Sequence, residues 1–255
     1  MHLNAIIQGP AGAQPPLVIA HGLFGSARNW GAVSKRLASR RQVIAVDMRN
    51  HGDSPWSDAH GYEEMAADLD ATIAALGGRA DLLGHSMGGK AAMTLALGAP
   101  ERVHRLIVAD VAPVGYRHSQ IGYVRAMQGL DLARLTRRAQ ADAALAAEVP
   151  EPGVRAFLLQ SLVFRETGAS WKLNLEVLEN EMPRIMDFPE PSGRFEGPAL
   201  FITGETSEYV RPEHWDRIRA LFPAARHREI AGAGHWLHAE APDAFVEAVE
   251  AFLAA

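Results

Sequence analysis

The sequence predicts an α/β fold, with a mostly parallel sheet flanked by helices and a helical insertion. Short apolar segments alternate with segments of helical periodicity through most of the 255 residues. This is the pattern of parallel strands that are joined by crossover helices. From about residue 113 to residue 197 the alternation stops, and the chain becomes rich in helical segments. The simplest interpretation is a helical insertion between two strands of one sheet.

The expected strands are short apolar runs, several of them followed by Gly-rich or polar turns. They lie at residues 17–20, 43–46, 81–83, 103–109, 199–203 and near 227–230. The helices expected between them repeat apolar side chains at helical spacing or are bounded by glycine and proline. They lie at residues 62–76, 90–97, 212–221 and 242–253.

The insertion is expected to contain helices at residues 139–148, 154–164 and 171–186 and no strand. The chain is therefore expected to divide into a core of residues 1–112 and 197–255 and an insertion of residues 113–196. It shows no internal repeat and no low-complexity tract.

The composition argues against several classes of function. A net charge of −5 provides no basic field for nucleic acid or anionic lipid. Cysteine is absent, which excludes disulfides, thiolate nucleophiles and cysteine-ligated metals. The chain has no apolar run of the roughly 18 residues that cross a bilayer, and its start does not resemble a signal peptide. We expect a soluble cytoplasmic protein, monomeric or homodimeric, without a nucleic-acid or membrane partner.

Residues 84–88 read Gly-His-Ser-Met-Gly, the pattern G-x-S-x-G, between an expected strand and an expected helix. That setting is the one a nucleophile elbow requires, with the oxygen of Ser86 exposed above the sheet. Residues 21–25 (HGLFG) directly follow another strand, and backbone N–H groups in such a turn can stabilise an oxyanion. The natural pair of donors is the N–H of Leu23 and the N–H of Met87. The alternative is a surface serine in a glycine turn, with the HG pair as a simple turn.

His235 is the best candidate for a general base among the 11 histidines. It lies in a Gly-rich loop between the last strand and the last helix, at the carboxyl edge of the expected sheet. His238 follows three residues later, which suggests a metal pair as an alternative. Since no third ligand pattern accompanies the two histidines, no metal site is expected.

These segments resemble the α/β-hydrolase superfamily over nearly the whole chain. HGLFGS, VDMRNHGDSP, GHSMGG, the insertion, the late GET loop and GAGHW carry the resemblance. VDMRNHGDSP, WKLNL and IMDFP are similar to one esterase branch, the YbfF-like and ABHD11-like hydrolases. The resemblance implies an α/β-hydrolase fold and a Ser-His-Asp triad that cleaves carboxylic esters or thioesters without a cofactor. The insertion would be the cap domain.

The position of the acid departs from the common pattern of the superfamily. Many members have an aspartate after the strand read here as ALFIT, where this chain has Ser207. Asp110 ends the preceding sheet strand, and some members place the acid there. A buried carboxylate at that point needs a partner, so we expect Asp110 to orient His235. The alternatives are Glu205 or Glu208 as the acid, or a purely structural Asp110.

The substrate is expected to be a small to medium acyl ester or thioester. Its contacts are expected at Phe24, Met127, Met186 and Trp236, with the alternative that the methionines are plain core. Basic residues of the insertion could meet the phosphates of an acyl-CoA, although such residues more often form a solvated face. Carbon–carbon bond hydrolysis or perhydrolysis with the same triad, or a receptor-like binding role with slow turnover, are the competing functions.

Overall fold

A seven-stranded sheet forms the centre of the structure, a computed structural model that describes residues 1–166, 168–191 and 193–255. Its strands are β1 (Ala5–Gln8), β2 (Leu17–Ala20), β3 (Val43–Val46), β4 (Ala80–His85), β5 (Val103–Ala109), β8 (Ala199–Gly204) and β9 (Ala225–Ile230). Their order is β1-β3-β2-β4-β5-β8-β9. The edge strand β1 runs antiparallel to β3, and the other pairs are parallel. The predicted mostly parallel sheet is confirmed.

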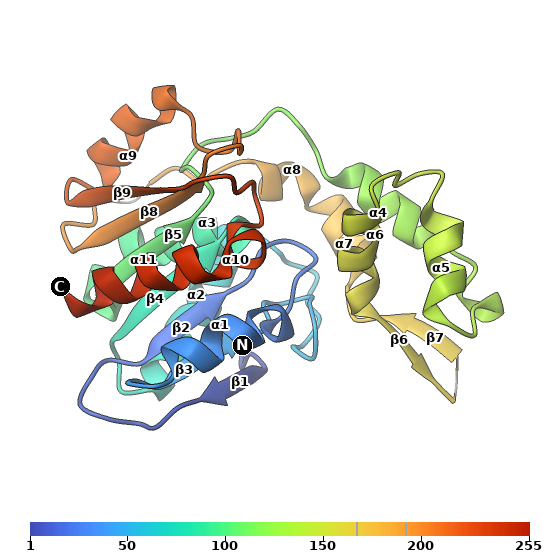
Figure 1. The fold of residues 1–255 in the computed structure, drawn as a ribbon, viewed down its shortest axis with the longest axis horizontal. Helices are drawn as coiled ribbons and strands as arrows, with labels where there is room; N and C mark the ends of the chain where they lie inside the picture. Colours follow the sequence, from blue (N-terminus) through green and yellow to red (C-terminus); the bar gives the residue numbers. More distant parts are fainter. Residues whose placement is uncertain (167, 192) are drawn as a thin grey trace.

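Helices cover both faces of this sheet (Figure 1). One face is packed by α1 (Gly31–Leu37), α10 (Leu237–Glu240) and α11 (Pro242–Ala254). The other face is packed by α2 (Tyr62–Ala75), α3 (Met87–Gly98) and α9 (Trp215–Leu221). Short 3₁₀ helices η1 (Ala27–Trp30), η2 (Pro100–Arg102) and η5 (Pro212–His214) accompany them. Because β4 is buried at every position and β5 at most, these strands are near-continuous apolar runs in the sequence.

The insertion between β5 and β8 lies beside the sheet (Figure 1). It contains α4 (Ile121–Gln128), η3 (Leu132–Arg134), α5 (Arg138–Leu145), α6 (Pro152–Leu158), η4 (Leu159–Ser161), β6 (Leu162–Arg165), β7 (Gly168–Trp171), α7 (Leu175–Asn180) and α8 (Met182–Met186). Among the described residues no helix has the length and apolar composition needed to cross a membrane.

The prediction that the insertion contains no strand is wrong, because β6 and β7 pair as an antiparallel hairpin. The helix expected at residues 154–164 ends at Leu158, and the one expected at 171–186 begins at Leu175. Each hairpin strand has four residues and is largely half-exposed, so it lacks a strong alternating or continuous apolar signal. The hairpin is held by packing, since Leu162 contacts a small core that includes Ala141 and Leu145 of α5.

Candidate active site

The residues singled out as catalytic come from loops that follow different strands of the sheet. Ser86 follows β4, Asp110 follows β5, and His235 lies in the loop after β9. Because β4, β5 and β9 all run parallel, their carboxyl ends meet at one edge. Ser86 and His235 line the same cavity, together with Leu23 and Met87.

The turn that carries Ser86 has the strained geometry of a nucleophile elbow. The backbone of Ser86 has φ 52° and ψ −119°, a conformation that non-glycine residues rarely adopt. The positions two residues before and two residues after Ser86 must be glycine. A Cβ on Gly84 would lie 2.2 Å from the carbonyl oxygen of Gly88. A Cβ on Gly88 would lie 2.3 Å from the carbonyl oxygen of Ala20 on β2. Strand β4 and helix α3 can therefore approach each other closely, which places the side chain of Ser86 above the edge of the sheet.

Asp110 is completely buried and is paired with His235. The Nδ1 atom of His235 lies 2.7 Å from Oδ2 of Asp110. The hydroxyl of Ser207 donates to the same carboxylate oxygen, and the N–H of Gly204 donates to the other at 3.2 Å. The structure thus gives this buried carboxylate three partners. Ser207, which occupies the position where many members of the superfamily have an aspartate, donates to Asp110 instead.

The alternative acids have other partners. The carboxylate of Glu205 accepts the N–H of Gly232 at 2.6 Å. The carboxylate of Glu208 forms an ion pair with Arg211 at 3.1 Å. The structure brings neither carboxylate to His235.

Two further residues hold His235, and the sequence analysis missed both. The ring of Tyr209 stacks on the imidazole, with centroids 3.9 Å apart and planes 16° apart. Nε2 of His85 donates to the carbonyl oxygen of His235 at 2.8 Å. Burial holds the pKa of His85 well below its usual value, so this donor stays neutral. For His85 a signal was available in the sequence, because it is the first x of the G-x-S-x-G motif and directly precedes Ser86.

The two N–H groups expected to bind an oxyanion are free of protein acceptors in the described part of the chain. Met87 is the first residue of α3, and the first amides of a helix have no intrahelical acceptor. Leu23 lies in a tight turn closed by a hydrogen bond of 3.0 Å from the N–H of Gly25 to the carbonyl oxygen of Gly22. Phe24 within this turn has φ 64°.

The cavity beside Ser86 is lined mainly by apolar side chains. Phe24, Met186 and Trp236 line it, together with residues of the insertion such as Phe157 and Ile185. The placement of Met127 at the substrate was wrong. Met127 is fully buried in the main core cluster and does not line the cavity, because its helix α4 turns this side chain toward the packed interior.

A buried lysine joins helix α3 to the insertion, and the sequence analysis did not single it out. Nζ of Lys90 donates to the carbonyl oxygens of Met186 at 3.0 Å and Asp187 at 2.6 Å. It also lies 4.6 Å from the ring centroid of Tyr116. Burial lowers the pKa of Lys90 to about 7. The two hydrogen bonds from Lys90 fix the backbone of the segment that places Met186 at the cavity.

His238, considered above as a metal ligand, packs against an aromatic ring. Its imidazole stacks on the indole of Trp30, with centroids 4.3 Å apart and planes 9° apart. No group of three potential metal ligands occurs among the described residues.

A family model for the alpha/beta hydrolase family matches residues 17–248, most of the chain. The chain belongs to the alpha/beta hydrolase family. It is 43% identical over 249 residues to the sn-1-specific diacylglycerol lipase ABHD11 of Mus musculus, covering 94% of this chain and 81% of that protein. It is 42% identical over 242 residues to esterase YbfF of Escherichia coli (strain K12), covering 93% and 92%.

A solved structure shows the same fold. A marine microorganism esterase superposes with a TM-score of 0.94 at 34% identity, covering 98% of this chain and 99% of that chain. Together with the two sequence relatives, it confirms the predicted resemblance to the YbfF-like and ABHD11-like branch.

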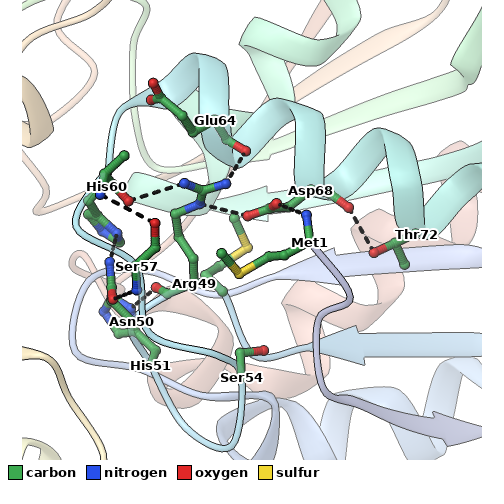
Figure 2. Close-up of polar contacts among 12 residues, drawn as sticks. Met1, Arg49, Asn50, His51, Ser54, Ser57, His60, Glu64, Asp68 and Thr72 are labelled. Atoms are coloured by element: carbon green, nitrogen blue, oxygen red, sulfur yellow. Dashed lines mark hydrogen bonds and ion pairs between the residues drawn. The ribbon is translucent and has the colours of Figure 1, made fainter.

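The sequence segment that marks this branch of the family orders the loop after β3 (Figure 2). The guanidinium of Arg49 pairs with the buried Asp68 of α2 at 2.7 Å. It also donates to the carbonyl oxygens of Ala59 at 3.1 Å and Glu64 at 2.9 Å. The N-terminal ammonium of Met1 reaches the other oxygen of Asp68. Arg49 is thus part of a structural network that orders this loop.

Two buried histidines of this hydrolase predict how its stability depends on pH. Burial lowers the pKa of His60 to about 3 and that of His238 to about 4. An unfolded histidine titrates near about 6.5, so between these values the unfolded state binds more protons. The free energy of unfolding therefore falls as the pH falls. We expect each histidine to remove about 2 kcal/mol between about pH 7 and pH 5.

Urea denaturation at the two pH values measures this effect. His60→Gln should reduce the pH dependence by the contribution of one histidine, whereas replacing the exposed His2 with glutamine should leave it unchanged. Equal pH dependence in wild type and His60→Gln would contradict the assignment.

Proposed function

We propose that this chain is a serine hydrolase that cleaves carboxylic esters or thioesters of small to medium acyl groups. The observation that carries the proposal is the pairing of buried Asp110 with His235, whose side chain lines the same cavity as Ser86. Two relatives named for ester cleavage, a diacylglycerol lipase and an esterase, support a hydrolase that acts on esters.

In the proposed mechanism, His235 acts first as base and then as acid. Nε2 of His235 takes the proton of Ser86 while the serine oxygen bonds to the acyl carbon. The N–H groups of Leu23 and Met87 stabilise the oxyanion. The tetrahedral intermediate then expels the alcohol or thiol, which receives the proton from His235. Water repeats the sequence on the acyl-serine, which releases the carboxylic acid and restores the serine.

Asp110 fixes the tautomer of His235 in this scheme. Its Oδ2 accepts the Nδ1 proton, which leaves Nε2 unprotonated and able to act as base. The same carboxylate balances the charge of the imidazolium that forms during the reaction. The hydrogen bonds from Ser207 and Gly204 hold the carboxylate in this position.

Covalent labelling and a substrate panel test the proposal. A fluorophosphonate probe should label the purified chain once, at Ser86, and peptide mapping locates the adduct. Paired oxygen esters and thioesters with acyl chains of rising length should then be hydrolysed, with a preference among the shorter to medium chains. A folded protein that is neither labelled nor active on any activated ester would refute the function.

We further propose that residues 113–196 form a cap over this site, with residues 1–112 and 197–255 as the core. Side chains of the insertion, among them Phe157, Ile185 and Met186, supply apolar surface to the cavity. An acyl chain bound between cap and core would contact that surface.

Met186→Asp tests this acyl pocket. Two methylenes of an acyl chain that lose an apolar contact cost about 1.6 kcal/mol, so we expect kcat/KM for a hexanoyl ester to fall about tenfold or more. The acetyl ester, which lacks those methylenes, should keep kcat/KM within about threefold. Met186→Leu, which keeps the apolar surface, is the matched control. Equal loss for both chain lengths would mark Met186 as structural.

A further inference from the structure

The loop after β3 is hydrogen-bonded to the turn that follows β2. We call residues 47–53 the β3 loop and residues 21–27 the oxyanion turn. The N–H of Phe24 donates to Nε2 of His51 at 3.2 Å, and the N–H of Ala27 donates to Asp47 at 2.7 Å. In the opposite direction, the N–H of Met48 donates to Nε2 of His21 at 2.9 Å. Side chains of each segment thus hold the backbone of the other.

His51 has one well-defined tautomer and ring position. Its side chain is fully buried. Its Nδ1 lies 2.9 Å from the carbonyl oxygen of Arg49, which can only accept, so Nδ1 carries the proton and Nε2 is the acceptor. Burial holds the pKa of His51 well below its usual value, which keeps the ring neutral. The ring also stacks near His60, with centroids 5.5 Å apart.

The insertion is also hydrogen-bonded to the β3 loop. Leu173 forms an antiparallel bridge with His51. The N–H of Asn174 donates to the carbonyl oxygen of Asn50 at 3.0 Å. Nδ2 of Asn174 donates to Oδ1 of the Asn50 side chain at 3.1 Å. Together with the contacts of Arg49 to α2 (Figure 2), these bonds fix the backbone that carries His51.

Nε2 of His51 accepts from the residue of the oxyanion turn that has a strained backbone, Phe24. Phe24 has a positive φ of 64°, and such a conformation persists only where its surroundings enforce it. The hydrogen bond from the N–H of Phe24 to His51 supplies that constraint. The adjacent residue is Leu23, which lines the cavity and whose N–H has no protein acceptor among the described residues.

We infer that His51 is a positioning residue for the oxyanion hole. By accepting the N–H of Phe24, it holds the turn in the conformation that points the N–H of Leu23 at the reacting carbonyl oxygen. The inference rests on the proposed serine hydrolase function. The inference gives the VDMRNHGDSP segment a role in catalysis through His51. The charged residues of this segment account only for the ordering of the loop.

His51→Leu tests the inference, because leucine fills the site but offers no acceptor. Loss of a whole oxyanion donor costs about 10² to 10³ in kcat, and a displaced donor costs less. We expect kcat to fall about 10- to 100-fold while KM changes less than about threefold. His51→Gln, whose side-chain oxygen can accept the same N–H, should recover most of the rate.

A second readout separates positioning from general structural damage. A trifluoromethyl ketone with the acyl chain of the substrate forms a hemiketal whose oxyanion occupies the same hole. Its inhibition constant should rise in His51→Leu by the factor by which kcat/KM falls. Binding of the matching methyl ketone, which forms little adduct, should be unchanged.

His60→Leu is the matched control. His60 is equally buried and lies against the His51 ring, but it has no hydrogen bond to the oxyanion turn. This variant should lose stability and keep kcat within about twofold. Equal losses of kcat in folded His51→Leu and His60→Leu, or a folded His51→Leu with wild-type kcat, would overturn the inference. If His51→Leu does not fold, His51→Asn, whose amide is too short to reach Phe24, replaces it in the comparison with His51→Gln. A wild-type protein that fluorophosphonate does not label would instead refute the proposed function itself.

Discussion

Ser86→Ala should abolish hydrolysis of activated esters, with a loss in kcat on the order of 10⁶. The variant keeps the oxyanion donors and the Asp110–His235 pair but has no atom that can bond to the acyl carbon. Alanine accepts the positive φ of this turn no better and no worse than serine, so the fold should persist. The thermal unfolding midpoint should therefore stay within a few degrees of the wild-type value.

Fluorophosphonate labelling and steady-state kinetics measure the loss. Ser119→Ala, which changes an exposed serine that does not line the cavity, should label and turn over like the wild type. Near-wild-type turnover in folded Ser86→Ala would remove the nucleophile from the proposed mechanism.

Four of the strands that the sequence predicted are buried on both faces, whereas β9, which was predicted near residues 227–230, is largely exposed. β2, β3, β4 and β8 are buried at every position, and strands of this kind are near-continuous apolar runs in the sequence. The edge strand β1 was not predicted, because its four residues are mostly half-exposed. Helix α1 was not predicted either. Its seven residues span about two turns, too few to establish a helical period.

The site residues divide in the same way. Ser86, Asp110 and His235 could be placed because parallel strands bring their carboxyl ends to one edge, so position along the chain predicts proximity. Residues that act through contacts between distant segments could not be placed. Nothing local shows that His51 meets Phe24 or that Lys90 meets the backbone of Met186.

Asp110→Asn should lower kcat by about 10³ to 10⁴. An asparagine amide that donates to Nδ1 stabilises the wrong tautomer of His235, and an amide cannot balance the charge of the imidazolium. Glu205→Gln and Glu208→Gln should each stay within about threefold of wild type, because their carboxylates bind Gly232 and Arg211 instead. Kinetics on variants with intact thermal unfolding make the comparison. Full activity in folded Asp110→Asn, or collapse in either glutamine variant, would assign the acid to another carboxylate.

The double variant Asp110→Asn with Ser207→Asp should recover part of this loss. The Ser207 hydroxyl and Nδ1 of His235 bind the same oxygen of Asp110, so a carboxylate introduced at position 207 starts next to the imidazole. β5 and β8 are paired neighbours, so we expect a carboxylate at the end of either strand to reach His235. We expect about tenfold recovery over Asp110→Asn. Recovery should be incomplete, because the N–H of Gly204 points at position 110. Ser207→Ala in the Asp110→Asn background controls for loss of the hydroxyl, and equal rates in the two double variants would show that the introduced carboxylate does not reach His235.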